Sequence, residues 1–302
     1  METFKAWINA ARLRTLPLSI SGILVGSALA NFNGYSSVAI LILALCTTIG
    51  FQITSNFAND YGDGVKGTDN EDRIGPKRAY QSGLLSGKAL KKGIYISIGI
   101  TMLLVIVLVY IAFGVENFWY VLIFLALGLL SIWAAIRYTV GSSAYGYRGY
   151  GDIFVFAFFG ILAVLGTQFL YMKTLMPISI LPAIAIGALS TGVLNLNNLR
   201  DWQSDTKSNK NTLIVKMGFR KGKQYHYLLL ITAFVCTLTF MVYTFTDWIH
   251  FIGLLAFVPI FVHFLRVFRV DSPSLLDPEL KKLALSTFLL AILFYFSYNN
   301  FL

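Results

Sequence analysis

Long apolar segments separated by short polar ones make up most of this chain. A helix needs roughly 20 mostly apolar residues to cross the hydrocarbon core of a bilayer, and segments of that kind recur throughout the sequence. They cover residues 15–32, 37–57, 94–113, 118–137, 152–172, 177–199, 225–246, 248–269 and 282–302. The pattern predicts an all-α polytopic membrane protein with nine transmembrane helices. We expect one domain over residues 1–302, because the connections are too short to form a separate soluble domain.

The first apolar segment needs a separate interpretation because it resembles a signal peptide. Residues 15–32 follow a basic stretch and contain Ser27-Ala28-Leu29-Ala30, which imitates a cleavage site. The apolar run is longer than most signal cores, however, and further spans follow it. We therefore expect an uncleaved first span, preceded by a short interfacial helix over residues 3–11 with Trp7 at the depth of the lipid headgroups.

Composition and charge support a membrane protein and indicate its orientation. Hydrophobic residues make up 57% of the chain and charged residues only 13%, whereas soluble proteins carry roughly 25% charged residues. All of the 24 lysines and arginines except Lys173 fall on one side of the predicted spans. Because basic flanks remain in the cytoplasm, we expect the N-terminus inside and the C-terminus outside. Topology thus accounts for the net charge of +10, and we predict no nucleic-acid partner.

Two acidic motifs lie on the predicted cytoplasmic side and have similar spacing. In each, an Asp follows an Asn by four residues, and a second Asp comes three or four residues later, so that the three side chains share one helix face. The motifs comprise Asn56, Asp60 and Asp63 at the end of the second span and Asn197, Asp201 and Asp205 after the sixth. Clustered carboxylates at the edge of a membrane require a positively charged partner.

Magnesium is the partner that this chemistry favours. Magnesium is commonly held by one or two carboxylates together with substrate phosphates, so we predict a Mg²⁺ site formed by four ligands. The predicted ligands, which we also expect to be the catalytic residues, are Asp60, Asp63, Asp201 and Asp205. Solvated acidic loops are the alternative, and we favour that interpretation for Asp69, Glu71 and Asp72 taken alone.

The surroundings of the motifs resemble the UbiA superfamily of intramembrane prenyltransferases, whose aspartate-rich motifs follow the second and sixth of nine helices. Asn59-Asp60-x-x-Asp63 is similar to the first motif and Asp201-x-x-x-Asp205 to the second. The family's first motif often continues with an Asp four residues later, where this chain has Gly67. Three further stretches, 75–83, 138–160 and 197–213, resemble the menaquinone-pathway branch of the superfamily.

The resemblance implies a UbiA-like helix bundle in the inner membrane of a bacterial cell and a Mg²⁺-dependent reaction. A polyprenyl diphosphate would donate its prenyl group to 1,4-dihydroxy-2-naphthoate, with loss of diphosphate and carbon dioxide, to give demethylmenaquinol. Another aromatic acceptor, 4-hydroxybenzoate, is the alternative within the family. A membrane cation transporter is the alternative from another class, although its carboxylates would lie near the middle of the bilayer. The resemblance specifies neither the length of the prenyl chain nor the oligomeric state.

We expect the two substrates to contact basic, amide and aromatic residues beside the motifs. Arginine forks and lysine charges bind phosphate oxygens, and aromatic faces shelter a cation. The predicted substrate-binding residues are Asn56, Asn59, Tyr61, Arg73, Lys77, Arg78, Gln81, Tyr138, Arg148, Asn197 and Asn198. Tyr147 is a further candidate for the aromatic wall, and Arg148 is the candidate that would hold the carboxylate of the acceptor through its planar fork.

The predicted orientation can be tested with reporter fusions. A reporter that is active only outside the cytoplasm, fused after Leu302, should be active, because an odd number of spans follows a cytoplasmic N-terminus. The same reporter fused in the connection around residue 210 should be silent. A silent fusion after Leu302, together with an active cytoplasmic reporter at that position, would show that the span count is wrong.

Overall fold

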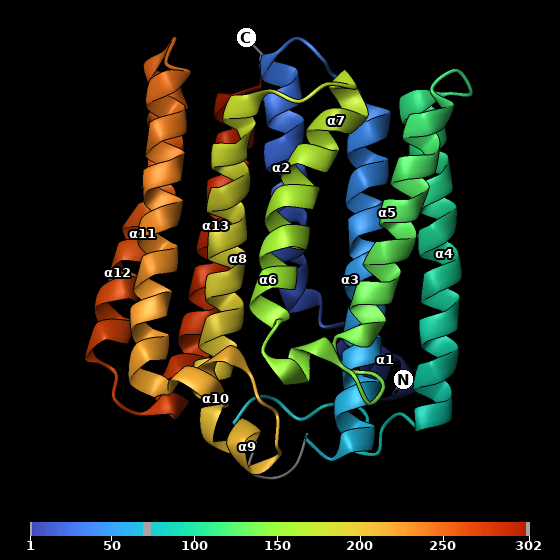
Figure 1. Ribbon diagram of the computed structural model, residues 1–302, viewed down its shortest axis with the longest axis vertical. Helices are drawn as coiled ribbons and strands as arrows, with labels where there is room; N and C mark the ends of the chain where they lie inside the picture. The colour runs from blue at the N-terminus through green and yellow to red at the C-terminus, as the bar shows by residue number, and fades with distance from the viewer. Residues whose placement is uncertain (1, 69–73, 300–302) are drawn as a thin grey trace.

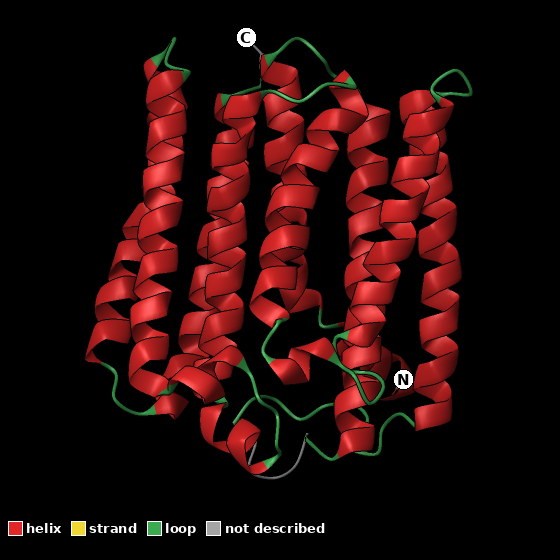
Figure 2. Ribbon diagram, viewed as in Figure 1, coloured by secondary structure: helices red, strands yellow, loops and turns green. Residues whose placement is uncertain are grey.

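The computed structural model describes residues 2–68 and 74–299, and these residues form helices joined by short loops, without a β-strand (Figure 2). Nine helical segments in the described ranges are long and apolar enough to cross a membrane, which confirms the predicted fold class. The α-helices are α1 (Glu2–Ala11), α2 (Leu16–Phe32), α3 (Val38–Lys66), α4 (Gly87–Phe113), α5 (Phe118–Arg137), α6 (Gly151–Val155), α7 (Thr167–Met172), α8 (Ile180–Arg200), α9 (Trp202–Lys207), α10 (Leu213–Met217), α11 (Phe219–Tyr243), α12 (Phe257–Arg269) and α13 (Asp277–Ser297).

Shorter helical turns complete several of the spans. A π-helical segment, Phe156–Gly166, joins α6 to α7, so that the fifth span is one continuous helix with a wider middle. The remaining turns are 3₁₀-helices: Leu13–Thr15, Tyr145–Arg148, Pro177–Ser179, Trp248–Ala256 and Pro273–Leu276.

The long helices run side by side in one bundle, and its two ends differ in character (Figure 1). At one end, the lower end in Figure 1, α3 and α8 finish and the small helices α9 and α10 follow; we call it the motif end. The N-terminal helix α1 lies at the motif end, whereas α13 finishes at the opposite end. The two halves of the chain therefore bring their acidic motifs to the same end of the bundle, as the spacing predicts.

The two motifs differ in backbone conformation, and only the first follows the predicted continuous helix. Helix α3 continues past the predicted end of its span at residue 57 and stops at Gly67, whose φ of 70° closes the helix in the left-handed conformation. Helix α8 instead ends at Arg200, and the chain turns at Asp201 before α9 begins. The prediction of one shared helical face is therefore wrong for the second motif, because Asp205 follows that turn.

The N-terminal segment forms the short helix that the sequence predicts over residues 3–11. Helix α1 packs against α3: Ala6 and Ala10 are buried, and the rings of Trp7 and Phe57 meet edge to face at 5.2 Å. Arg12, with a φ of 51°, separates α1 from the turn that leads into α2. A non-glycine residue in this left-handed region costs energy, so Arg12 marks a sharp change of chain direction at the motif end.

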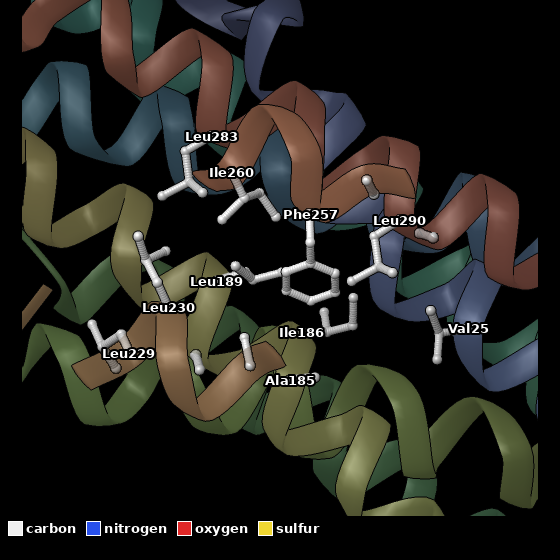
Figure 3. Close-up of a cluster of buried hydrophobic side chains, with 14 of the residues drawn as sticks. Val25, Ala185, Ile186, Leu189, Leu229, Leu230, Phe257, Ile260, Leu283 and Leu290 are labelled. Atoms are coloured by element: carbon white, nitrogen blue, oxygen red, sulfur yellow. The ribbon is translucent and has the colours of Figure 1, made fainter. Parts of the chain in front are cut away.

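The largest hydrophobic core lies among α2, α8, α11, α12 and α13. Phe257 lies in the middle of this cluster with Ile186 and Leu189 beside it (Figure 3). Another core joins α3 and α4 with residues of α2 and α7 and includes Val105 and Phe113, and α5 packs against it. Val105 of this core also lines the cavity described below.

Glycines allow the fifth span to approach its neighbours closely. A Cβ atom on Gly22 would come within 2.7 Å of the Phe159 carbonyl oxygen, and one on Gly26 within 2.4 Å of the Val164 carbonyl oxygen. The Gly22-x-x-x-Gly26 pair therefore packs against the π-helical segment, as expected for a small-residue face. Gly160 of the same segment faces Gly187 of α8.

Gly160 gives a direct test of this packing. A Cβ atom there would lie 2.5 Å from the Gly187 Cα and 2.6 Å from the Ala183 carbonyl oxygen, and backbone atoms cannot move aside. We expect Gly160→Ala to destabilise the protein by about 1–3 kcal/mol and to lower its apparent melting temperature in detergent. Gly99→Ala on α4 is the matched control, because a Cβ atom at Gly99 would meet nothing within 4 Å. Equal melting temperatures for the two variants would contradict the close approach.

Candidate active site

Acidic residues from both motifs meet in a small polar pocket at the motif end. Helix α3 contributes Asp63, the α8–α9 junction contributes Asp201, and α9 contributes Asp205. The pocket is lined by Asp63, Thr68, Arg78, Asn197, Asp201, Ser204, Asp205 and Lys210. Residues that are far apart in the sequence thus form one site in which three carboxylates lie beside two cationic side chains.

Asp63 is held by the loop that connects α5 to α6. The Tyr147 hydroxyl donates a hydrogen bond to Asp63 Oδ1 at 2.8 Å, and the Arg78 guanidinium lies 4.0 Å from Asp63 Oδ2. Burial, reinforced by the Asp63 carboxylate, raises the pKa of the Tyr147 hydroxyl, so the phenol remains a proton donor at neutral pH. The Lys66 ammonium lies 3.9 Å from the centre of the Tyr147 ring. Tyr147 therefore fixes the orientation of the Asp63 carboxylate.

Asp205 and Lys210 form a buried ion pair on the second motif. The Lys210 ammonium lies 3.5 Å from Asp205 Oδ1, while Asp205 Oδ2 has no hydrogen-bond partner. Burial raises the pKa of the Asp205 carboxyl to about 6, although the charge of Lys210 opposes this shift. Burial alone would lower the pKa of Lys210, but the carboxylates of Asp205 and Asp63 outweigh it and raise that pKa. One buried oxygen of Asp205 is thus open to a further ligand.

Asp201 is engaged by its neighbour in the chain. The Arg200 Nε and Nη2 atoms donate to the two carboxylate oxygens of Asp201 at 2.8 and 2.6 Å. Arg200 Nη2 also donates to Asn197 Oδ1 at 2.9 Å, which ties the amide of the motif to the same guanidinium. Both oxygens of Asp201 are therefore occupied by one arginine fork.

Asp60 has a different environment from the other three motif carboxylates. It is buried and accepts a hydrogen bond from the backbone N–H of Tyr80 at 3.3 Å, and the Arg12 guanidinium interacts with it electrostatically. Asp60 does not line the small pocket, and its Oδ2 atom has no hydrogen-bond partner. Backbone donors at residues 79–80 thus draw Asp60 toward the 74–86 connection.

The carboxylate arrangement is compatible with a divalent cation only if other oxygens complete its shell. Within the described ranges, no three His, Cys, Asp or Glu side chains converge closely enough to hold a metal ion by themselves. Magnesium, however, usually takes one or two carboxylates and fills its remaining positions with water and phosphate oxygens. The unpartnered buried oxygens of Asp60 and Asp205 have the chemistry of such ligands. The residues therefore fit Mg²⁺, whereas the predicted set of four ligands remains a prediction.

A larger cavity of about 800 Å³ opens beside the small pocket and extends between the two hydrophobic cores. Four residues line both spaces: Asp63, Arg78, Asn197 and Lys210. Farther from the motifs the lining becomes apolar, with residues of α3, α4 and α5 and of the π-helical segment. The cavity therefore combines one charged end with a long apolar compartment.

Aromatic rings form one wall of the cavity. The rings of Tyr145 and Phe154 stack with centroids 3.9 Å apart, and Phe158 continues the stack at 6.2 Å from Phe154. Tyr138 meets Tyr145 edge to face at 5.4 Å and also lines the cavity. This wall presents flat apolar faces and ring quadrupoles close to the charged end.

The structure brings some of the predicted substrate-binding residues to the cavity. Those that line it are Asn56, Asn59, Arg78, Tyr138 and Asn197. Asn56 is fixed there by a bond from its Nδ2 to the Ala11 carbonyl oxygen at 2.8 Å, and the Asn59 Oδ1 accepts from Thr139 at 3.2 Å. These amides lie on the α3 wall beside Asp63.

Other predicted residues lie elsewhere. Tyr61 packs on the α4 side of α3 with Tyr80, and the Lys91 ammonium lies 5.3 Å from its ring centre. Lys77 is exposed, Asn198 is buried outside the cavity, and Gln81 Oε1 accepts from the backbone N–H of Arg78 at 3.4 Å. Arg73 lies outside the described residues, as do Asp69, Glu71 and Asp72.

The geometry does not support Arg148 as the residue that contacts the acceptor. Its side chain is exposed, its Nη2 donates to Ser143 Oγ at 3.2 Å, and it does not line the cavity. Gly149, with a φ of 83°, ends the 3₁₀ turn and sends the chain into α6. This turn places the neighbouring Tyr147 in the site and leaves Arg148 outside it.

Sequence reasoning missed several cationic residues of the site. Lys210 is not among the predicted site residues, although its position within the stretch that follows the second motif is a usable signal. Arg12 and Arg14, at the start of the first span, and Lys281 and Lys282, on α13, also line the cavity. No spacing in the sequence connects these two pairs to the acidic motifs.

Comparisons with known proteins agree on one family. The model of the UbiA prenyltransferase family matches residues 19–286. The 1,4-dihydroxy-2-naphthoate octaprenyltransferase of Haemophilus influenzae is 44% identical over 296 residues, which cover 97% of this chain and 95% of that protein. The protein of the same name from Escherichia coli is 42% identical, over 96% of this chain and 94% of its own length.

A solved structure shows the same fold at low sequence identity. A UbiA homologue from Archaeoglobus fulgidus, bound to GPP and Mg²⁺, superposes with a TM-score of 0.66 and 14% identity over 96% of this chain and 99% of that one. The family resemblance inferred from the paired aspartate motifs is thus confirmed along nearly the full length. This chain belongs to the UbiA prenyltransferase family.

Proposed function

We propose that this chain transfers a polyprenyl group from a polyprenyl diphosphate to 1,4-dihydroxy-2-naphthoate, with loss of diphosphate and carbon dioxide, in menaquinone biosynthesis. The observation that carries the proposal is the similarity to naphthoate octaprenyltransferases at 44% and 42% identity over nearly the whole chain. The cavity supports it, because a charged end suits a diphosphate and a long apolar compartment suits a prenyl chain. Carboxylates at one end of the bundle also argue against a cation transporter, which needs them near the middle of the bilayer.

Mg²⁺ is the proposed cofactor, held with the diphosphate by the motif carboxylates Asp60, Asp63, Asp201 and Asp205. Support comes from the unpartnered buried oxygens of Asp60 and Asp205 and from the Mg²⁺ bound with GPP in the Archaeoglobus fulgidus homologue. When bound, the cation polarises phosphate oxygens and stabilises the leaving group.

Basic residues of the chain bind the remaining charge of the diphosphate. Arg78 and Lys210 line both the small pocket and the cavity, so their charges face the place where the diphosphate and the prenyl chain meet. A guanidinium fork and an ammonium point charge both suit phosphate oxygens. These groups are preorganised, because Asp63 and Asp205 already hold them near the pocket.

The reaction breaks one carbon–oxygen bond and forms one carbon–carbon bond. The electron pair of the allylic carbon–oxygen bond leaves with the diphosphate. The ring carbon of the naphthoate that bears the carboxylate then attacks the resulting allylic cation. The bond between this ring carbon and the carboxylate breaks, carbon dioxide departs, and the electron pair of the broken bond restores the aromatic ring. The residues of the chain bind and orient the two substrates for this exchange.

The aromatic wall serves the cationic stage of this reaction. Tyr138, Tyr145 and Phe154 line the cavity beside its charged end, where their ring faces stabilise positive charge. Their apolar surface also excludes water, which would otherwise capture the allylic cation and give a prenyl alcohol. The flat stack is suited to contact with the bicyclic ring of the acceptor.

The proposed site lies at the cytoplasmic face of a bacterial inner membrane, with the N-terminus in the cytoplasm and the C-terminus outside. The positive-inside rule supports this orientation, because all basic residues except Lys173 belong to the motif side of the predicted spans. The first and last described residues also lie at opposite ends of the bundle, as an odd number of spans requires (Figure 1).

Activity should depend on a divalent cation and on the motif carboxylates. Asp63→Asn and Asp205→Asn keep the size of each side chain but remove an anionic oxygen, and we expect each to lower kcat/KM by at least roughly 100-fold. EDTA should abolish prenyl transfer by the wild-type protein, and added Mg²⁺ should restore it. Asp271→Asn, an exposed site in the α12–α13 connection, is the control and should retain activity. Full activity in EDTA would contradict the metal dependence.

The acceptor should be 1,4-dihydroxy-2-naphthoate rather than 4-hydroxybenzoate. We expect purified protein that is offered both acids with one prenyl diphosphate to give mainly the prenylated, decarboxylated naphthol, because the identity to naphthoate enzymes runs along the entire cavity-forming chain. Mass spectrometry of the products distinguishes the two outcomes, since only the naphthoate product has lost carbon dioxide. Prenylated 4-hydroxybenzoate as the main product would assign the chain to another acceptor within the family.

A further inference from the structure

Arg200 connects the second acidic motif to the last helix of the bundle. Its guanidinium is buried, and it donates to Asp201 through Nε and Nη2 and to Asp277 Oδ1 through Nη1 at 2.6 Å. Asp201 belongs to the α8–α9 junction, whereas Asp277 is the first residue of α13. A single positive charge is thus shared between two carboxylates, and the fork that faces Asp201 occupies both of its oxygens.

This arrangement limits how Asp201 can act. Because the guanidinium already lies against both oxygens of Asp201, a divalent cation that binds this carboxylate is repelled by Arg200, and the repulsion favours withdrawal of the fork from at least one oxygen. Arg200 also lines the large cavity, as does Asp277. A fork that withdraws from Asp201 therefore remains beside the charged end of the cavity, where its N–H groups can bind phosphate oxygens.

Asp277 is held in place independently of Arg200. Two residues further along α13, Glu279 accepts from Lys282 Nζ at 2.6 Å and from His263 Nδ1 at 2.8 Å. Glu279 and His263 are both buried, and His263 belongs to α12. This network fixes the first turn of α13, and hence the position from which the Asp277 carboxylate meets Arg200.

We propose that Asp277 is a positioning residue for diphosphate binding: it tethers Arg200, so that a divalent cation at Asp201 transfers the arginine fork to the substrate diphosphate. The inference rests on the proposed function, because it requires a diphosphate and a cation at the motif end. Asp277 acts through Arg200 and touches neither the acceptor nor the reacting carbon. It also adds a second negative charge to the ion pair, so that Arg200 does not fully neutralise Asp201.

A binding experiment without an acceptor tests this role. The probe is a prenyl thiolodiphosphate, in which sulfur replaces the bridging oxygen and slows ionisation, and Mn²⁺ replaces Mg²⁺ so that bound cation is observed by electron paramagnetic resonance. We expect Asp277→Asn to raise the Kd of the probe and the half-saturating Mn²⁺ concentration by roughly threefold to tenfold. Asp277→Glu, which restores the carboxylate, should recover most of the affinity.

Matched controls separate tethering from a general loss of structure. Asp271→Asn removes the same charge from the exposed connection just before α13 and should bind Mn²⁺ and the probe like the wild-type protein. In steady-state kinetics, Asp277→Asn should raise the KM of the prenyl diphosphate and leave the KM of the acceptor within about twofold, since only the former depends on Arg200. A lower melting temperature with unchanged affinity in the folded protein would make the Asp277–Arg200 bond merely structural and would overturn the inference.

The experiment also distinguishes this inference from the proposed function. If the wild-type protein fails to bind the probe in a Mn²⁺-dependent manner, the proposed function fails and the inference fails with it. If the wild-type protein binds but Asp277→Asn binds equally well, only the tether is overturned. Because no acceptor is present, the result does not depend on which aromatic acid the protein uses.

Discussion

The burial of several carboxylates in one small pocket is the constraint on which the motif end depends. Like charges at close range repel, and the repulsion grows as water is excluded, so each carboxylate requires its own compensating group. Asp63 receives the Tyr147 hydroxyl and faces Arg78, Asp205 pairs with Lys210, and Asp201 is held by Arg200. These partners come from three different connections and one helix end. The short loops at this end of the bundle therefore deliver neutralising groups to the motifs as well as joining the spans.

The same constraint explains why the cavity has two unlike compartments. A charged substrate group is stable only where the cations lie, and Arg78 and Lys210 face the cavity at that end alone. Beyond them the wall consists mainly of stacked rings and aliphatic side chains, which favour apolar ligands. The close approach of Gly22, Gly26 and Gly160 to their neighbours keeps the fifth span, which carries part of that wall, tightly against α2 and α8. The shape of the substrate compartment thus depends on how closely the spans pack.

The sequence predicts this fold well because its strongest signals are local. An apolar run of span length and a one-sided distribution of lysine and arginine require no knowledge of distant contacts, and the paired motifs Asn56-Asp60-Asp63 and Asn197-Asp201-Asp205 point to the correct end of the bundle. The rest depends on contacts between distant positions. Tyr147 and Asp63 are 84 residues apart, and Arg200 and Asp277 are 77 residues apart, so neither contact produces a periodic pattern in the sequence. The sequence also does not predict that Arg148 is exposed, because the turn that ends at Gly149 decides whether Tyr147 or Arg148 enters the site.

Two motifs with nearly the same spacing have acquired different environments, and the difference has consequences for how each binds a ligand. In the first motif, backbone N–H groups hold Asp60 away from the pocket, and a phenol orients Asp63. In the second, Asp205 keeps one buried oxygen without a partner, whereas Asp201 is closed by an arginine fork. An oxygen without a partner can accept a cation directly, whereas a cation at Asp201 must compete with the positive charge of the Arg200 fork. Similar sequence spacing therefore does not give equivalent sites. In the first motif the hydrogen bonds to the carboxylates come from neutral donors, with Arg78 4.0 Å from Asp63, whereas the carboxylates of the second motif pair with cations that are themselves able to bind phosphate.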